Sequence, residues 1–224
     1  MLAVAFRNPR YNKPGAAWHY SNASSTLLGL AAENATGQSL ATIIDRKVCK
    51  PLGLKSTGLC TEPSPPSPSP KAYRHGKAGR WLGYGDSFVE VTGFSASWAG
   101  VGGDMYSTVA DLGIATRALA TGGLLSDSSS SELLSWQPTF WPGVDYGFLI
   151  NRNPRGVGHE GNVPGFQAVA RYQEQKQRTI VVLTNLSNNA DGSMPAETLF
   201  DLVVDHLDQK ALSPPTATRS AAPE

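Results

Sequence analysis

The first half of the chain contains two consecutive stretches with the apolar spacing of helices. From Ser24 to Thr36, apolar residues recur at i, i+3 and i+4 positions, and Gly37 supplies a C-terminal stop. A second, shorter helix is predicted between a cap at Ser39 and an end at Pro51. Its predicted apolar face consists of Leu40, Ile43, Ile44 and Val48. Two helices in tandem predict a helical subregion.

The pattern between residues 61 and 103 is typical of loops. Residues 61–71 hold five prolines, so we expect an exposed extended loop and neither a helix nor a central strand there. Residues 71–103 show no stable period and end in a glycine cluster at 99–103. No strand precedes this cluster and no Gly-Lys-Ser/Thr follows it, so we predict a tight turn beside packed backbone instead of a phosphate site.

A third helix is predicted after Thr108, which forms a capping box with Asp111. The helix is closed by Gly122 and Gly123, and a serine-rich turn follows at 126–131. Its predicted apolar face consists of Val109, Leu112, Ala115 and Leu119.

The last third of the chain changes to the pattern of strands. Residues 146–151, 166–172 and 179–185 are rich in branched and aromatic side chains, and the last two segments flank a polar turn. They are predicted to be antiparallel strands. A final helix from Pro195 packs on that sheet through a face consisting of Leu199, Phe200, Val203, Val204 and Leu207.

These elements predict one α+β domain over residues 1–210. Its helical region comprises 14–60 and 104–125, and its sheet and C-terminal helix comprise 145–210. Residues 211–224 have the composition of a disordered tail.

Composition narrows the class of partner. The 19 basic and 18 acidic residues are scattered and give a net charge of +1, so nothing indicates a nucleic-acid or membrane surface. A small molecule or a peptide is the partner we expect. No apolar run approaches the ~20 residues that span a bilayer, and Met1–Phe6 is too short for a signal-peptide core. The sequence indicates no compartment.

The two cysteines allow two readings of equal weight. Cys49 and Cys60 could close a small disulfide loop in an oxidising compartment, or remain two unpaired thiols. A lone cysteine pair without a nearby histidine is a poor metal site, so we predict neither a metal nor another cofactor.

Two short polar stretches could carry chemistry. Tyr20-Ser21-Asn22 directly precedes a helix, where Tyr20 could be only an anchor and Asn22 only a cap. His159 lies in Gly-His-Glu-Gly, and flanking glycines let a ligand approach the imidazole. It is the best candidate among four histidines; the others, His19, His75 and His206, are predicted to be solvated or structural. Glu160 completes no zinc motif, because the residue three past it is Val163.

Several segments, in order, resemble one family. They are PGAAWHYSNASSTLLGLAAENATGQSL, PLGLKSTGL, SWAGVGGDMYSTVADLGIATRALATGGLL, and YGFLINRNPRGVGHEGNVPGFQAVARY followed by TIVVLTN. From about residue 14 to about residue 207 the chain is similar to the serine beta-lactamase-like family, which includes class C beta-lactamases, D-alanyl-D-alanine carboxypeptidases and related esterases. The resemblance implies a beta-lactamase/transpeptidase-like fold, with an antiparallel sheet, flanking helices and a helical region. It implies hydrolysis of an amide or ester through an acyl-enzyme.

The resemblance also implies site residues. Tyr20 matches the tyrosine of the Tyr-x-Asn motif, which takes part in proton transfer with the nucleophile, and Asn22 matches the asparagine that contacts the substrate amide. His159-Glu160-Gly161 matches the third motif in its His-x-Gly form, on a strand that borders the pocket. We therefore expect Tyr20, Asn22 and His159 to be catalytic, and Glu160 and Gly161 to bind substrate. Ser21 is the variable middle residue.

One motif of the family is missing. The family's nucleophile is a serine in a Ser-x-x-Lys motif well upstream of Tyr-x-Asn, but only 19 residues precede Tyr20 and none of the eight lysines has a serine three residues before it. Tyrosine with an unperturbed pKa of ~10 is a poor base without nearby cations. We therefore expect the C-terminal part of a serine hydrolase, inactive as this chain alone, with an uncovered sheet edge and core face.

Two other readings stay open. The chain could be a non-catalytic relative that keeps the pocket as a binding module. It could also be a complementing subunit whose partner chain supplies the missing N-terminal segment.

Overall fold

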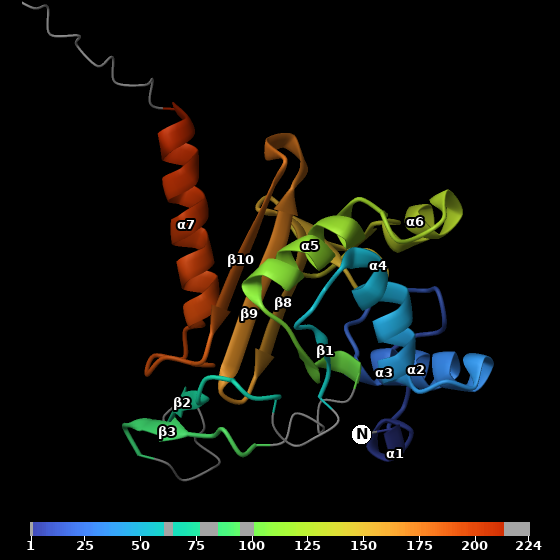
Figure 1. Cartoon of the computed structure of the whole chain (residues 1–224). Coiled ribbons are helices and arrows are strands. Elements are labelled where there is room, and N and C mark those ends of the chain that lie inside the picture. Colours follow the sequence, from blue (N-terminus) through green and yellow to red (C-terminus); the bar gives the residue numbers. More distant parts are fainter. Residues whose placement is uncertain (1, 61–64, 77–84, 95–100, 213–224) are drawn as a thin grey trace, which may run out of the picture.

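The core of the molecule is a six-stranded antiparallel sheet (Figure 1). The computed structural model describes residues 2–60, 65–76, 85–94 and 101–212. The sheet order is β10-β9-β8-β7-β6-β5. Its strands are β5 (Gln137–Pro138), β6 (Asp145–Tyr146), β7 (Asn151–Asn153), β8 (Gly156–Val163), β9 (Phe166–Gln173) and β10 (Arg178–Thr184). Every strand follows its spatial neighbour in sequence, so short turns make all the connections.

One helix covers each face of the long strands (Figure 1). Helix α7 (Pro195–Leu212) contacts β9 and β10, and α5 (Val109–Ala120) contacts β8, β9 and β10. Alternate residues of β9 face the two helices. Val169 packs with α7 in the hydrophobic core, and the ring of Tyr172 lies 5.9 Å from the guanidinium carbon of Arg117 on α5. The core cluster consists of Val169, Ile180, Ala196, Phe200 and Val204.

The helical region lies beside this sheet (Figure 1). It is built from α1 (Leu2–Ala5), α2 (Asn22–Thr36), α3 (Leu40–Ile44), a π-helical turn η1 (Asp45–Cys49) and α4 (Lys50–Leu52). A further helix, α6 (Asp127–Leu133), precedes β5, and the 3-10 turn η4 (Glu174–Lys176) joins β9 to β10. In the part of the chain that the structure describes, no helix combines the length and the apolar character needed to cross a bilayer.

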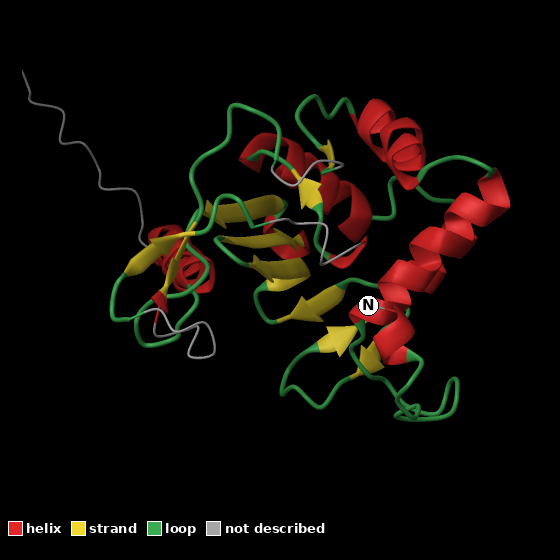
Figure 2. Ribbon diagram, turned by 90° about the horizontal axis from the view of Figure 1, so that it is seen from below, coloured by secondary structure: helices red, strands yellow, loops and turns green. Residues whose placement is uncertain are grey.

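Two small antiparallel pairs lie outside the main sheet. Strand β1 (Gly58–Leu59) pairs with β4 (Met105–Tyr106), and β2 (Tyr73–His75) pairs with β3 (Phe88–Glu90). Figure 2 shows them as separate short arrows apart from the strands of the main sheet.

The predicted α+β architecture is confirmed. The segments expected as strands at 166–172 and 179–185 are β9 and β10, paired antiparallel in register from Thr184 with Gln167 to Arg178 with Gln173. Thr108 caps α5 by accepting a hydrogen bond from the Asp111 N–H at 3.2 Å. Residues 65–71 are neither helix nor strand, as their prolines predict; residues 61–64 and 77–84 lie outside the described ranges.

Three predictions of secondary structure are wrong. Pro51 does not end its helix but lies in the first turn of α4, because the preceding turn widens to a π-helix in which the Lys50 N–H donates to the Asp45 carbonyl. Residues 126–131 are not a turn, since Ser126 caps α6 by accepting from the Ser129 N–H. Residues 71–103 contain the β2–β3 pair, which their aperiodic pattern did not predict.

The segment 146–151 is likewise not one strand. It ends β6 and begins β7, with a tight turn closed by a 2.8 Å bond from the Gly147 N–H to the Ile150 carbonyl. A Cβ at Gly147 would lie 2.2 Å from the Leu133 carbonyl oxygen, so only glycine lets the chain turn there.

The predicted helix faces are partly wrong. On α5, Val109 is 53% exposed, and Asp111 is buried because its carboxylate accepts from the Ser56 N–H and the Thr57 hydroxyl. On α7 the buried stripe is narrower than predicted: Phe200 and Val204 are buried, but Leu199 is 46% exposed. The helix also continues to Leu212, two residues into the predicted tail; residues 213–224 lie outside the described ranges.

The cysteine alternatives are resolved in favour of two free thiols. Cys49 is buried, with its Sγ 3.5 Å from the Thr57 carbonyl oxygen, and Cys60 is partly buried. Burial raises the pKa of both thiols, and neighbouring aspartates add to this effect. Of the two alternatives, the disulfide is the one that this structure does not contain.

Candidate active site

The Tyr20-Ser21-Asn22 triplet leads directly into α2. Ser21 is the N-cap, with extended backbone at φ −153°, but its side chain makes no capping hydrogen bond. Asn22 is the first residue of the helix. The prediction that it lies in the connection before the helix is therefore wrong by one residue. The Asn22 carbonyl accepts from the hydroxyls of Ser25 (2.9 Å) and Thr26 (3.1 Å). Neither side chain caps the helix, and both Ser21 and Asn22 line the adjacent cavity.

The predicted third motif lies on β8. In register, His159 pairs with Ala170 and Glu160 with Val169. Because alternate residues of a strand face opposite sides, Glu160 lies on the α7 side with Val169, and His159 lies on the other side. The motif is therefore divided between two faces of the sheet.

A cavity of about 370 Å³ joins the two predicted motifs. It contains Tyr20, Asn22 and His159, which the sequence separates widely, and the Tyr20 and His159 rings lie 6.4 Å apart between centroids. Its described lining comes from three segments: Trp18–Asn22 with Ser24, Ser25 and Leu28; Val101 and Gly102; and Tyr146–Leu149 with His159. The structure thus brings the three predicted catalytic residues together; their roles stay predictions.

The glycine cluster forms one wall of this cavity. Gly102 packs closely on the start of α2: a Cβ there would lie 3.2 Å from Asn22 Oδ1 and 3.3 Å from Ser25 Oγ. The described residues 101–103 form a tight turn, as predicted, but Gly102 packs against side chains and not against backbone. Residues 99 and 100 lie outside the described ranges.

Both ring nitrogens of His159 are engaged. Nδ1 faces the Glu160 carbonyl oxygen, which can only accept, so Nδ1 carries the proton. Nε2 lies 2.7 Å from the Tyr146 hydroxyl. In the neutral ring Nε2 is the acceptor, and Tyr146 donates. Tyr146 is therefore the hydrogen-bond partner that fixes the imidazole in the cavity.

The two cavity tyrosines are held in their phenol form. Burial raises the pKa of Tyr20, and the charge of Glu160 adds to the shift. Burial likewise raises the pKa of Tyr146 to about 12. A tyrosine with a raised pKa is a poor proton acceptor at neutral pH. The charge that acts on Tyr20 is the negative charge of Glu160, whereas Tyr20 would need a neighbouring cation to act as a base.

Side chains from neighbouring strands of the sheet hold Glu160 in place. Its carboxylate pairs with Arg171, which is 1% exposed, and accepts from the Asn151 amide at 3.1 Å. Burial alone would raise the pKa of Glu160, but the Arg171 charge and the hydrogen bonds from Asn151 and Arg171 outweigh it and hold that pKa below its usual value. Glu160 lies off the described cavity lining and acts on the tyrosines through its charge, and its expected contact with substrate stays a prediction.

Gly161 is exposed and also lies outside the described lining of the cavity. A Cβ there would meet only the Cβ of Ala168, at 3.9 Å. It returns to the His159 side of the strand, where the backbone stays open, and its expected contact with substrate stays a prediction.

Sequence reasoning missed most of the hydrophobic lining. Trp18 packs on Tyr146 with ring centroids 4.9 Å apart, and Phe148 and Leu149 come from the β6–β7 turn that was read as a strand. The signal available was the tryptophan two residues before Tyr20. His19, predicted to be merely solvated or structural, also lines the cavity, although its ring stacks on Tyr11 at 3.8 Å.

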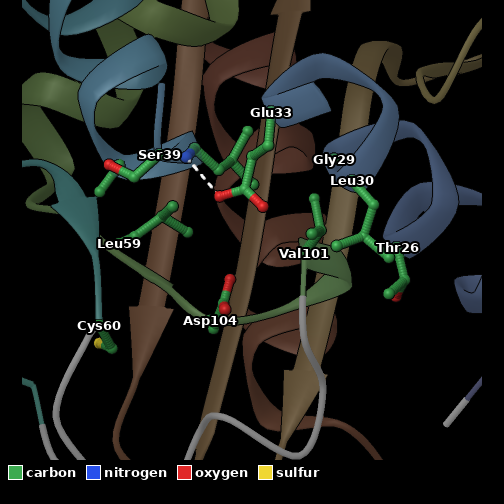
Figure 3. A pocket seen from close by; sticks show the side chains of 11 residues that line it. Thr26, Gly29, Leu30, Glu33, Ser39, Leu59, Cys60, Val101 and Asp104 are labelled. Atoms are coloured by element: carbon green, nitrogen blue, oxygen red, sulfur yellow. Dashed lines mark hydrogen bonds between the residues drawn. The ribbon is translucent and has the colours of Figure 1, made fainter. Parts of the chain in front are cut away.

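A second cavity of about 300 Å³ lies along α2 (Figure 3). Glu33 and Asp104 point into it from opposite sides, among Leu30, Leu59 and other apolar residues. One Glu33 oxygen accepts from the Leu40 N–H at 2.7 Å, the bond drawn in Figure 3. None of Tyr20, Asn22 and His159 lines it. Within the described ranges, no group of three histidine, cysteine, aspartate or glutamate residues is placed to hold a metal ion.

Solved structures of known enzymes share this fold. A D-stereospecific amidohydrolase from Streptomyces sp. is 28% identical with a TM-score of 0.72, and the match covers 83% of this chain and 55% of that one. The D-amino acid amidase from Ochrobactrum anthropi SV3 bound to D-phenylalanine is 24% identical with a TM-score of 0.79, covering 93% and 63%. A penicillin binding protein from Bacillus halodurans is 20% identical with a TM-score of 0.71, covering 90% and 60%.

The chain therefore spans less than two thirds of the length of these similar proteins. The family model described as Beta-lactamase matches residues 1–203, nearly the whole of the described structure. The fold, the order of the motifs and this match agree. This chain belongs to the beta-lactamase family.

Proposed function

We propose that this chain forms the substrate-binding wall of a serine hydrolase that cleaves an amide or ester through an acyl-enzyme. The observation that carries the proposal is the convergence of Tyr20, Asn22 and His159 on one cavity from two distant segments. Tyr20 exchanges a proton with the nucleophile and leaving group, and Asn22 contacts the substrate amide. His159 orients the carbonyl once the substrate displaces one of the two hydrogen bonds of its ring. The names of two structural neighbours, an amidohydrolase and an amidase, support an amide as the bond cleaved.

The nucleophile is proposed to come from residues outside this sequence. None of the eight lysines has the Ser-x-x-Lys spacing, and Tyr20 faces the charge of Glu160 with its pKa raised. A hydroxyl nucleophile needs an adjacent base, which a neutral phenol does not provide. As this chain alone, the protein is therefore proposed to be inactive.

A fusion protein tests both parts. The Ser-x-x-Lys-bearing segment of a family member is joined to this chain, and each protein is incubated with a labelled fluorophosphonate. We expect a stoichiometric adduct on the serine of the added segment and none on this chain alone. In the fusion, Tyr20→Phe should slow adduct formation by on the order of 10²-fold or more, the usual contribution of proton transfer.

The matched control replaces the serine of the added segment by alanine, which should abolish the adduct. An adduct on a serine of this chain alone would contradict the proposed inactivity. A folded fusion that forms no adduct would contradict the assignment as a hydrolase.

A second candidate is a complementing subunit, favoured by surfaces that the described chain leaves open. Along Arg178–Thr184, β10 pairs with β9 only, among the strands described. On α2, three leucines are exposed by 40% to 49%: Leu27, Leu28 and Leu30. An unpaired edge strand and an apolar helix face are both surfaces on which another segment packs. Mixing the separate Ser-x-x-Lys segment with this chain and measuring complex formation by light scattering tests this candidate; two unassociated species at micromolar concentration would contradict it.

A third candidate is a binding module that keeps the pocket without catalysis, favoured by a cavity that is already formed without the nucleophile segment. In this case Tyr20→Phe and His159→Ala should weaken ligand binding while the melting temperature changes little. Unchanged binding in both variants would count against it.

A further inference from the structure

The cavity has a hydrophobic side built from the β6–β7 turn. Phe148 and Leu149 line it, and they are 56% and 53% exposed. The turn is held by 2.8 Å hydrogen bonds from the Phe148 N–H to the Leu133 carbonyl and from the Gly147 N–H to the Ile150 carbonyl. Two large apolar side chains are thus fixed at an open surface instead of being buried.

Leu149 also has an unusual backbone, with φ at +60°. This left-handed conformation is unfavourable for a bulky side chain, and it persists only where the surroundings impose it. The hydrogen bonds on both sides of Leu149 impose it here. Strain of this kind clusters at ligand sites, so the turn is a candidate contact for an apolar group.

Aromatic rings continue the hydrophobic side. Trp18 lines the cavity and packs on Tyr146, with ring centroids 4.9 Å apart. Behind it, Trp141 and Phe140 lie 5.2 Å and 5.6 Å from Trp18 between centroids, outside the cavity lining. Trp18 is thus supported by a second layer of rings and presents a rigid apolar surface.

The charge around the cavity disfavours an anion. None of the described lining residues is lysine or arginine. Both ring nitrogens of His159 are engaged, by the Glu160 carbonyl and the Tyr146 hydroxyl. The negative charge of Glu160 acts on both cavity tyrosines, and its ion-pair partner Arg171 opposes it at Tyr146 only. In this chain alone, a carboxylate entering the described part of the cavity would lose its water without gaining a counter-ion, which is costly.

We propose that the group entering this cavity is uncharged and carries an aromatic or bulky aliphatic side chain, as in the amide or ester of a hydrophobic amino acid and not the free acid. This inference rests on the proposed function, because it names the substrate class of the same site. A site of this kind prefers the amides or esters that an amidase or esterase cleaves over substrates with a free terminal carboxylate.

Isothermal calorimetry on the full chain at about pH 8, where free imidazole is neutral, tests the inference. Three matched probes are used in each enantiomer: N-acetylphenylalanine amide, N-acetylphenylalanine and N-acetylalanine amide. We expect the preferred enantiomer of the phenylalanine amide to bind at least about tenfold more tightly than the other two probes. The acid would bury an unpaired charge, and the alanine amide lacks the aromatic contact. Equal affinity for amide and acid would overturn the charge part, and equal affinity for the two amides would overturn the side-chain part. Absence of binding by all three probes would overturn the inference as a whole.

Two variants sharpen the test. Phe148→Ala should weaken the phenylalanine amide by about tenfold, and Phe148→Arg should reverse the preference towards the acid, because it supplies the missing cation. Phe88→Ala is the control, since this ring lies on β3, is 62% exposed and is outside the lining. Unchanged binding in both Phe148 variants would overturn the inference.

These outcomes are independent of the fluorophosphonate experiment. A fusion that acylates while the chain shows no preference among the probes refutes this inference and leaves the proposed function intact. A chain with the expected preference in a fusion that fails to acylate refutes the proposed function alone.

Discussion

Strand β9 and helix α2 are both central to the molecule, yet they are covered to very different degrees. Six of the eight residues of β9 are buried, on both faces, because β8 and β10 flank the strand and α5 and α7 cover it. Of the fifteen residues of α2, only Ser25 and Gly29 are buried, and the exposed residues include three leucines. The difference shows that segments of this chain cover β9 on both faces and both edges, whereas α2 keeps apolar surface for a ligand or a further segment.

The largest effect is expected from the ion pair between the buried Arg171 of β9 and the partly exposed Glu160 of β8. Arg171 pairs with Glu160 and donates to the Asn151 side-chain oxygen (2.8 Å) and the Gly156 carbonyl (3.0 Å). Arg171→Met leaves a partly exposed carboxylate without its counter-ion, and it leaves the Asn151 side-chain oxygen and the Gly156 carbonyl without their donor. We therefore expect a loss of about 3–5 kcal/mol in the free energy of unfolding. Urea denaturation measures it. Adding Glu160→Gln should recover part of the loss, and a further loss in the double variant would contradict this reading.

The same pair predicts a dependence on pH. The pKa of Glu160 is lowered in the folded state, so its contribution is present above the ordinary glutamate pKa and is lost as the pH falls through the folded-state value. Stability of the wild-type chain should therefore fall with acidification below about pH 4.5. In Glu160→Gln that part of the slope should be missing; identical slopes would argue against the pairing.

Two glycines of β8 provide the next contrast. A Cβ at Gly158 would lie 1.9 Å from the Ala170 carbonyl oxygen, which is backbone and cannot move without breaking the ladder. A Cβ at Gly161 would make only an ordinary contact with the Ala168 Cβ, at 3.9 Å. We expect Gly158→Ala to cost about 3 kcal/mol in unfolding free energy and Gly161→Ala less than about 0.5. Thermal unfolding by circular dichroism compares them. A tolerated Gly158→Ala would mean that β8 and β9 pair less closely than in this structure.

On α7 the contrast lies between two sides of one helix. Val204 is 1% exposed and packs in the core, while Leu202 is 61% exposed. Val204→Ala should lower the free energy of unfolding by about 2 kcal/mol through lost burial and a residual cavity. Leu202→Ala is the matched control and should change it by less than about 0.5. Similar losses in both would indicate that the outer side of α7 is covered in solution, for instance by a second copy.

The smallest effect is expected on α2. Leu30 is 49% exposed and lines the second cavity, so Leu30→Gln should change the unfolding free energy of this chain by less than about 0.5 kcal/mol. In the fusion with the Ser-x-x-Lys segment the same change should cost more, because the added segment buries this face. A loss above about 1 kcal/mol in the chain alone would show that α2 is already covered.

The sequence predicted well where one local signal decided the outcome. Thr108 with Asp111 located the start of α5, and the branched residues at 166–172 and 179–185 located β9 and β10. The motif residues Tyr20, Asn22 and His159 were found from their order along the chain, and the structure brings them to one cavity.

Prediction failed where a distant contact outweighed a local preference. The periodicity of α5 placed Val109 inwards, but the hydrogen bonds of Asp111 to Ser56 and Thr57, more than fifty residues away, rotate the helix. The apolar run at 146–151 reads as a strand, but it turns because Phe148 bonds to the Leu133 carbonyl. No pattern within a short window contains either partner.

By itself the sequence determined the family, the α+β class, the identity of the motif residues and the lack of a Ser-x-x-Lys motif among its eight lysines. Only the tertiary structure decided that Glu160 faces Arg171 while His159 faces the cavity, that Tyr146 holds the imidazole, and that Trp18 and Phe148 supply apolar walls. The reason is physical: residue type is local, but which face a strand residue occupies and what it meets there depend on register and packing between segments far apart in the chain.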